Sequence, residues 1–166
     1  MSRFHNRYNA AVQTNSKQSE KFIHNFPNNI AGFQAWCESI DKNNEKLGLE
    51  DQLNKAIGTR LPLKNIPCIS ELFRYVQWHN HAFSVIKYHK IDSLIVHYEE
   101  YENHYDDVVN NLFSFLELSR QRKERYPFDL GKSYKDYYEK EQILHFTKAA
   151  QKISSAETWE HLKRYF

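Results

Sequence analysis

A short apolar run at residues 94–96 constrains the fold of this chain more than any other feature, because it is the only convincing β-strand in 166 residues. It opens the stretch Ser93–Leu118 and leads into an acidic turn. A single strand leaves its backbone donors and acceptors unpaired. Consecutive apolar positions are typical of a strand buried on both faces, as in a parallel sheet covered by helices. The sequence therefore predicts an α/β fold with one parallel-sheet strand near residues 93–98, whose partner strands are not in this chain.

The other periodic segments predict helices, because their apolar residues recur every three or four positions. These segments are residues 3–13, 29–40, 69–86, 105–116, 140–152 and 155–165. Asn103 is a candidate cap for the helix after the strand, and Ser154 with Glu157 has the capping-box spacing for the last helix. Residues 41–68 predict a loop with a short helix near 49–57, and residues 119–135 predict an irregular basic loop.

Composition excludes several classes of protein. The 23 basic and 21 acidic residues give a net charge of +2, which argues against a non-specific nucleic-acid binder. No apolar stretch is long enough for a membrane segment. The mean hydropathy of −0.80 is polar for a complete globule, and it fits either a part of a domain that carries outer helices or a soluble helical domain. Cys37 and Cys68 could pair, but two cysteines do not identify a redox compartment.

Two patterns suggest a metal site and a nucleotide-binding loop, but their residues do not have the spacing that these sites require. His79 and His81 are two positions apart on a predicted helix and face apart, and no other metal-ligand spacing occurs, so we expect no metal site. Gly131-Lys132-Ser133 resembles the end of a Walker A loop. That motif requires a glycine where this chain has Tyr126, and no buried strand leads into it.

Three segments, in this order, resemble the C-terminal half of a sulfotransferase domain that uses 3′-phosphoadenosine 5′-phosphosulfate (PAPS). Residues 3–9 (RFHNRYN) are similar to the end of the family's 3′-phosphate motif, in which a serine follows an arginine by three residues. Residues 83–100, which end in LIVHYEE and are followed by Tyr101, resemble the segment W-x-x-x-F followed by L-V-x-x-Y-E-D-L. Residues 131–138 and the final SSAETWEHLKRYF resemble the cofactor loop and closing helices.

The resemblance covers nearly the whole chain and implies a truncated, P-loop-like sulfotransferase fold. Residues 1–166 would be a partial domain from which the N-terminal, phosphosulfate-loop half is missing. By this resemblance Arg3 and Asn6 contact the 3′-phosphate of the nucleotide, where the planar guanidinium suits a phosphate and the amide can donate a hydrogen bond. The loop that closes over the nucleotide would consist of Gly131, Lys132, Ser133 and Tyr134.

The departures from the family pattern concern catalysis. The phosphosulfate loop, which resembles P-K-S-G-T-T, is absent, and so is the His or Glu that acts as the base. Asn6 stands where serine is usual, and the R-K-G-x-x-G loop of some members is not present. We therefore expect no catalytic residue in this chain and no activity from it alone.

The resemblance implies an enzyme that transfers a sulfuryl group from PAPS to a hydroxyl or amine, with a carbohydrate as the favoured acceptor and no metal. A membrane-anchored eukaryotic carbohydrate sulfotransferase would place it in the Golgi lumen, and any other member in the cytoplasm. The alternative is a non-catalytic helical interaction protein or pseudoenzyme. Such a protein could form a homo-oligomer through the unpaired edge of the strand.

Overall fold

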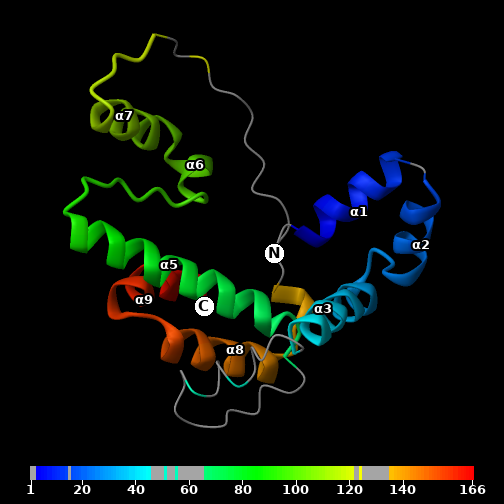
Figure 1. The fold of residues 1–166 in the computed structure, drawn as a ribbon. Coiled ribbons are helices and arrows are strands. Elements are labelled where there is room, and N and C mark those ends of the chain that lie inside the picture. Colours follow the sequence, from blue (N-terminus) through cyan, green and yellow to red (C-terminus); the bar gives the residue numbers. More distant parts are fainter. Residues whose placement is uncertain are drawn as a thin grey trace. The chain divides into compact units, whose positions relative to one another are not determined.

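The computed structural model describes residues 3–14, 16–45, 51, 55, 66–121, 124 and 135–166. Its helices are α1 (Arg3–Thr14), α2 (Lys17–Asn25), α3 (Ile30–Glu45), α5 (Ile69–His89), α6 (Glu100–Asn103), α7 (Tyr105–Phe115), η1 (Lys135–Tyr137), α8 (Lys140–Ile153), α9 (Ala156–Leu162) and η2 (Lys163–Tyr165) (Figure 1). Most of the predicted helices are confirmed. The short helix predicted near 49–57 and most of the basic loop at 119–135 lie outside the described residues.

The predicted strand near residues 93–98 is wrong, and with it the α/β fold class and the truncated P-loop-like sulfotransferase fold. Residues 91–97 form neither helix nor strand, and the side chain of Ile95 is 41% exposed. A strand exists only through hydrogen bonds to a neighbouring strand. No segment among the described residues pairs with 91–97 in that way, so the described part of the chain is helical.

The chain divides into two compact units, one made of residues 1–85 and 133–166 and the other of residues 86–132. Most of α5 belongs to the first unit, and its last residues, from Ile86 onward, belong to the second. No helix within the described ranges is both long enough and apolar enough to cross a lipid bilayer. That residues 1–166 form part of a single sulfotransferase domain stays a prediction.

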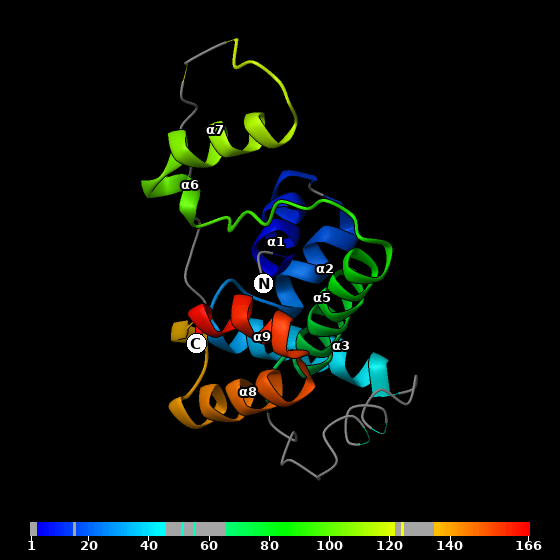
Figure 2. The ribbon, with the colours of Figure 1, turned by 90° about the vertical axis from the view of Figure 1, so that its left-hand side faces the viewer.

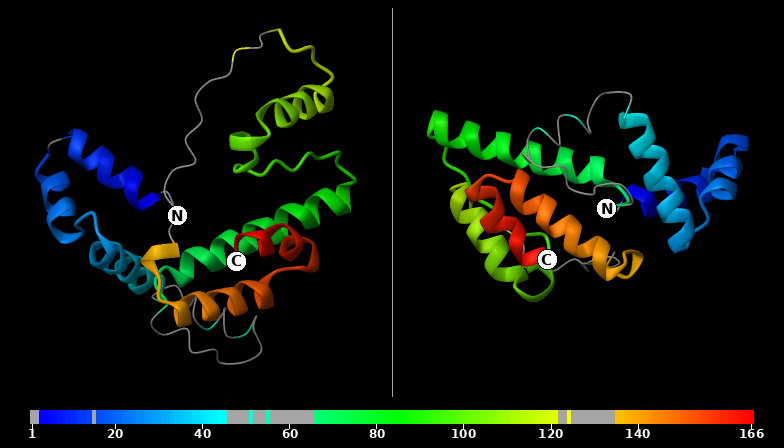
Figure 3. Two further views of the ribbon diagram at one scale, coloured as in Figure 1. Left: turned by 180° about the vertical axis from the view of Figure 1, so that it is seen from behind. Right: turned by 90° about the horizontal axis from the view of Figure 1, so that it is seen from below.

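The larger core of the first unit lies between α5, α8 and α9, which run side by side (Figures 1 and 3). Its buried residues are Ile66, Leu72, Val76, Phe146, Ala149, Ala150, Ile153 and Leu162. The two alanines on α8, Ala149 and Ala150, are fully buried in this core. Asn80 on α5 closes the turn between α8 and α9, because its amide donates to the carbonyl of Ile153 at 2.7 Å and accepts from the N–H of Ser155 at 2.8 Å.

A second, aromatic core lies between α1 and α3. It contains Phe4, Phe33, Trp36, Cys37 and Cys68. The ring of Phe4 is fully buried, with its centroid 5.7 Å from that of Phe33 and 5.5 Å from that of Trp36. These contacts fix α1 on α3, while α1 also packs against α2 (Figure 2).

Side-chain caps explain where several helices begin. Ser16 accepts from the N–H of Ser19 at the start of α2, a helix that the sequence analysis missed. Asn29 accepts from the N–H of Gly32 at 2.8 Å and begins α3 where the sequence predicts. The cap of α9 is Ser155, which accepts from the N–H of Thr158 at 3.1 Å, so the prediction of Ser154 is one residue too early.

The joint between α2 and α3 requires glycine at position 32. A Cβ atom built on Gly32 would lie 1.9 Å from the carbonyl oxygen of Pro27, far inside van der Waals contact. The atom that it would meet is backbone and cannot move aside as a flexible side chain can. The chain between α2 and α3 is therefore packed directly against the first turn of α3.

The second unit contains the end of α5, the short helix α6 and α7. Val108 is its buried apolar residue among those described. Arg120 folds back onto α7, where it pairs with Asp106 at 2.8 Å and lies over the ring of Tyr105, 5.9 Å from the centroid. The predicted cap Asn103 is wrong, because Asn103 is the last residue of α6 and His104 precedes α7.

Candidate functional site

The two residues predicted to hold the 3′-phosphate both lie on α1. Arg3 is the first residue of the helix as described, and Asn6 is exposed one turn later. Positions three apart lie on the same side of a helix, so the two residues belong to one face of α1. The fully buried ring of Phe4, between them in sequence, anchors this turn of α1 to α3.

A contact between His5 and Tyr137 joins α1 to η1. The two rings meet edge to face with centroids 5.9 Å apart, and the Tyr137 hydroxyl lies 3.4 Å from Nε2 of His5. Tyr137 also packs edge-on against Phe33, at 5.2 Å between centroids, so α1, α3 and η1 meet at one place. Both partners are half-buried, and 132 residues of sequence separate them.

This contact brings together the two ends of the chain that carry the predicted cofactor residues. Gly131, Lys132, Ser133 and Tyr134 directly precede η1 in the sequence and lie outside the described residues. The structure thus joins η1, which follows the predicted loop, to the helix that carries Arg3 and Asn6. His5 and Tyr137 were missed by the sequence analysis, because nothing local marks two aromatic side chains that meet across the fold.

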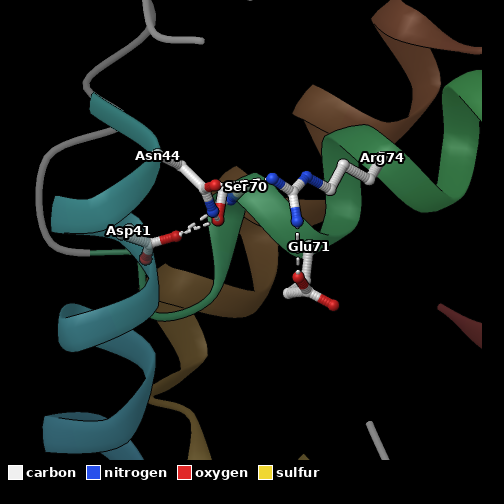
Figure 4. Close-up of polar contacts among 5 residues, drawn as sticks. All are labelled: Asp41, Asn44, Ser70, Glu71 and Arg74. Carbon is white, nitrogen blue, oxygen red and sulfur yellow. Dashed lines mark hydrogen bonds and ion pairs between the residues drawn. The ribbon is translucent and has the colours of Figure 1, made fainter. Parts of the chain in front are cut away.

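A second polar group connects α3 to the beginning of α5 (Figure 4). Asp41 accepts from the hydroxyl of Ser70 at 2.5 Å and from its backbone N–H at 3.1 Å. Asn44 donates to the same hydroxyl oxygen at 2.8 Å, and Arg74 donates to the amide oxygen of Asn44 at 2.6 Å. Glu71 pairs with Arg74 at 3.5 Å.

This polar group resembles the parts of a nucleophilic site, but it is a structural joint. A serine nucleophile needs a neighbouring base and access to a substrate. The hydroxyl of Ser70 already donates to Asp41, and Ser70 and Asn44 are only 6% and 5% exposed. The joint therefore holds two helices together and leaves no room for a substrate at the serine.

The pKa of Asp41 is raised above its ordinary value, because burial disfavours the carboxylate more than the hydrogen bonds from Ser70 and from neighbouring backbone groups favour it. Burial, and then the charge of Asp41, also raise the pKa of Tyr138 well above its usual range. Tyr138 therefore stays protonated, and its hydroxyl donates to the carbonyl of Pro67 at 3.4 Å. Both groups act in packing rather than in proton transfer.

Among the residues that the structure describes, no three His, Cys, Asp or Glu side chains come together as metal ligands would. Comparison with known proteins adds no identity: no family model, no curated protein and no solved structure matches this chain. The site is therefore defined by the sequence resemblance and by the meeting of α1 with η1.

Proposed function

We propose that this chain is part of a PAPS-dependent sulfotransferase, which transfers a sulfuryl group from PAPS to a hydroxyl or amine, with a carbohydrate as the acceptor. The chain supplies the part that binds the nucleotide. Arg3 and Asn6 hold the 3′-phosphate, and Gly131, Lys132, Ser133 and Tyr134 cover the nucleotide. The residues that position the sulfuryl group and take the acceptor's proton are not in this chain.

The contact between His5 and Tyr137 is the observation that carries the proposal. In the resemblance, the 3′-phosphate motif and the cofactor loop are far apart in sequence and act on one nucleotide. The contact between α1 and η1 supports that arrangement, because it links the two segments through rings 5.9 Å apart. The proposal rests on this link and on the order of the motifs, and no longer on a parallel sheet.

The arrangement suits an anion with two or more oxygens. A guanidinium donates two parallel hydrogen bonds to a phosphate, and an amide adds a third donor. Sulfuryl transfer depends mainly on positioning and on stabilising charge, by analogy with phosphoryl transfer. A rigid anchor for the 3′-phosphate contributes positioning, and the buried ring of Phe4 supplies that rigidity to α1.

The test is binding of adenosine 3′,5′-bisphosphate, the nucleotide product of PAPS, by titration calorimetry. We expect this nucleotide to bind more tightly than adenosine 5′-monophosphate, which lacks the 3′-phosphate. Arg3→Ala should remove this preference, and Arg3→Lys should keep part of it, because lysine retains the charge but loses the fork. Lys17→Ala on α2 is the charge-matched control and should bind as the wild type does. Equal affinity for the two nucleotides would contradict the proposal.

A non-catalytic helical interaction protein is the second candidate. Tyr75 and Trp78 on α5 favour it, because these large side chains lie one turn apart and are 51% and 67% exposed. Exposed aromatic side chains are common in protein interfaces. The predicted oligomer through a strand edge has lost its basis, since the described residues contain no strand. If this candidate is correct, adenosine 3′,5′-bisphosphate should not bind. Trp78→Ala should then weaken a concentration-dependent association of the protein that is seen by light scattering.

A further inference from the structure

The two cysteines of this chain form a disulfide bond that ties α3 to the residue just before α5. Cys37 and Cys68 are 31 positions apart in sequence, and their Cα atoms lie 4.5 Å apart. The whole chain contains only these two cysteines. Any thiol chemistry of these 166 residues therefore concerns this one bond.

The bond is closed to solvent. Cys37 is fully buried, and Cys68 is 5% exposed. Both belong to the aromatic core with Phe4, Phe33 and Trp36. Exchange requires a thiolate to reach one sulfur of the bond, so the folded protein protects the disulfide from dissolved thiols. This argues for a structural bond rather than one that opens and closes in use.

Residues on both sides of Cys68 make contacts that depend on where the backbone of Cys68 is held. Its φ angle of 61° lies in the left-handed region, which a residue with a side chain adopts only when its surroundings hold it there. The next residues begin α5, where Ser70 bonds to Asp41. Before it, the carbonyl of Pro67 accepts from Tyr138. The disulfide thus fixes the point at which α3, α5 and the residue after η1 meet.

We infer that folding of this chain is completed by oxidation of Cys37 and Cys68, so that the protein matures in an oxidising compartment such as the endoplasmic reticulum lumen or a bacterial periplasm. Two thiols each lose a proton, and the pair gives two electrons to the disulfide of an oxidoreductase, which leaves as a dithiol. One sulfur–sulfur bond forms in the chain and one breaks in the oxidant. The inference is independent of the proposed sulfotransferase activity.

The first measurement is a thiol count on the chain produced in a bacterial periplasm, made in denaturant without reductant. We expect no free thiol before reduction with dithiothreitol and two after it. Reduced protein should unfold at a temperature about 10 °C lower than oxidised protein. The native oxidised protein should resist a concentration of dithiothreitol that reduces the denatured chain at once.

The double variant Cys37→Ala, Cys68→Ala is the matched control, because it leaves no thiol in the chain. Its unfolding temperature should be close to that of reduced wild type and should not respond to dithiothreitol. Two free thiols in the periplasmic protein would overturn the inference, and so would an unchanged unfolding temperature on reduction. Both decisive measurements use wild-type protein, so they stand even if the double variant fails to fold.

Discussion

Asp41 on α3 accepts two hydrogen bonds from Ser70 on α5, one from the hydroxyl at 2.5 Å and one from the backbone N–H at 3.1 Å. The first backbone N–H groups of a helix have no partner within it, and they are usually capped by a side chain next to them in sequence. Here the cap comes from another helix, 29 residues earlier. The start of α5 is thus stabilised by tertiary structure, beside the disulfide that holds Cys68.

The Asp41→Asn variant should change how stability depends on pH. The folded-state pKa of Asp41 is raised, chiefly by burial, so the folded protein holds this proton more tightly than the unfolded chain does. Its contribution to the free energy of unfolding is full below about pH 4 and is lost as the pH rises through the raised pKa. Asparagine has no proton to lose, so the variant should lack this decline.

Urea unfolding of wild type and variant at several pH values checks this prediction. Subtracting the two profiles removes the other titrating groups. We expect the stability of the wild type relative to Asp41→Asn to decrease as the pH rises from about 4 toward neutrality. Parallel profiles would show that burial does not shift the carboxyl.

Asn80→Ala should destabilise the fold by about 1–3 kcal/mol, because it removes both hydrogen bonds of Asn80. The carbonyl of Ile153 then keeps only the longer bond from the amide of Gln77, at 3.5 Å. Asn80→Asp should destabilise the fold to a similar extent, because the carboxylate places an oxygen opposite the carbonyl of Ile153, which now accepts at 2.7 Å. His81→Ala, at an exposed position of the same helix, should change stability little. Denaturant unfolding compares the three, and a neutral Asn80→Asp would contradict the assigned donor.

Phe4→Ala should lower the free energy of unfolding by about 3–5 kcal/mol, because the lost ring leaves a cavity in the aromatic core. Val12→Ala on the same helix is the control, since Val12 is 55% exposed and should tolerate truncation within about 0.5 kcal/mol. Both values come from urea unfolding. Similar small losses at the two positions would show that α1 is not held by this ring.

Ser155→Ala should destabilise the protein by about 1 kcal/mol through loss of the cap of α9. Ser154→Ala should have a smaller effect, because the Ser154 hydroxyl bonds only back to the carbonyl of Ala150 at the end of α8. Thermal unfolding of the two variants orders the residues directly. The reverse order would restore Ser154 as the cap that the sequence alone suggests.

The sequence predicted the helices that bury one face along most of their length. In α5, Leu72, Val76 and Phe83 recur at helical spacing and are all buried. It missed α2, where Phe22 and Ile23 stand in a polar segment and no residue is buried. Such a helix depends on its cap and on its neighbour α1, where the guanidinium of Arg7 lies over the ring of Phe22 at 4.9 Å.

The failure at residues 94–96 has a different cause. An apolar run indicates side chains that favour burial. A strand also needs a neighbouring strand that pairs with its backbone N–H and C=O groups, and the run does not show whether one exists. The contacts of the candidate site were also beyond prediction from a local sequence pattern. Arg3 and Asn6 were chosen from one short motif, whereas the link between His5 and Tyr137 and the disulfide between Cys37 and Cys68 join distant positions that no local pattern connects.

Gly32 gives the joint between α2 and α3 an unusual genetic property. Every missense change in a glycine codon introduces a Cβ atom, and at position 32 that atom would lie 1.9 Å from the backbone oxygen of Pro27. The position therefore offers no mild first mutation from which drift could begin. In a population carrying this gene, missense changes at that codon should be removed by selection for folding alone, whatever reaction the protein serves.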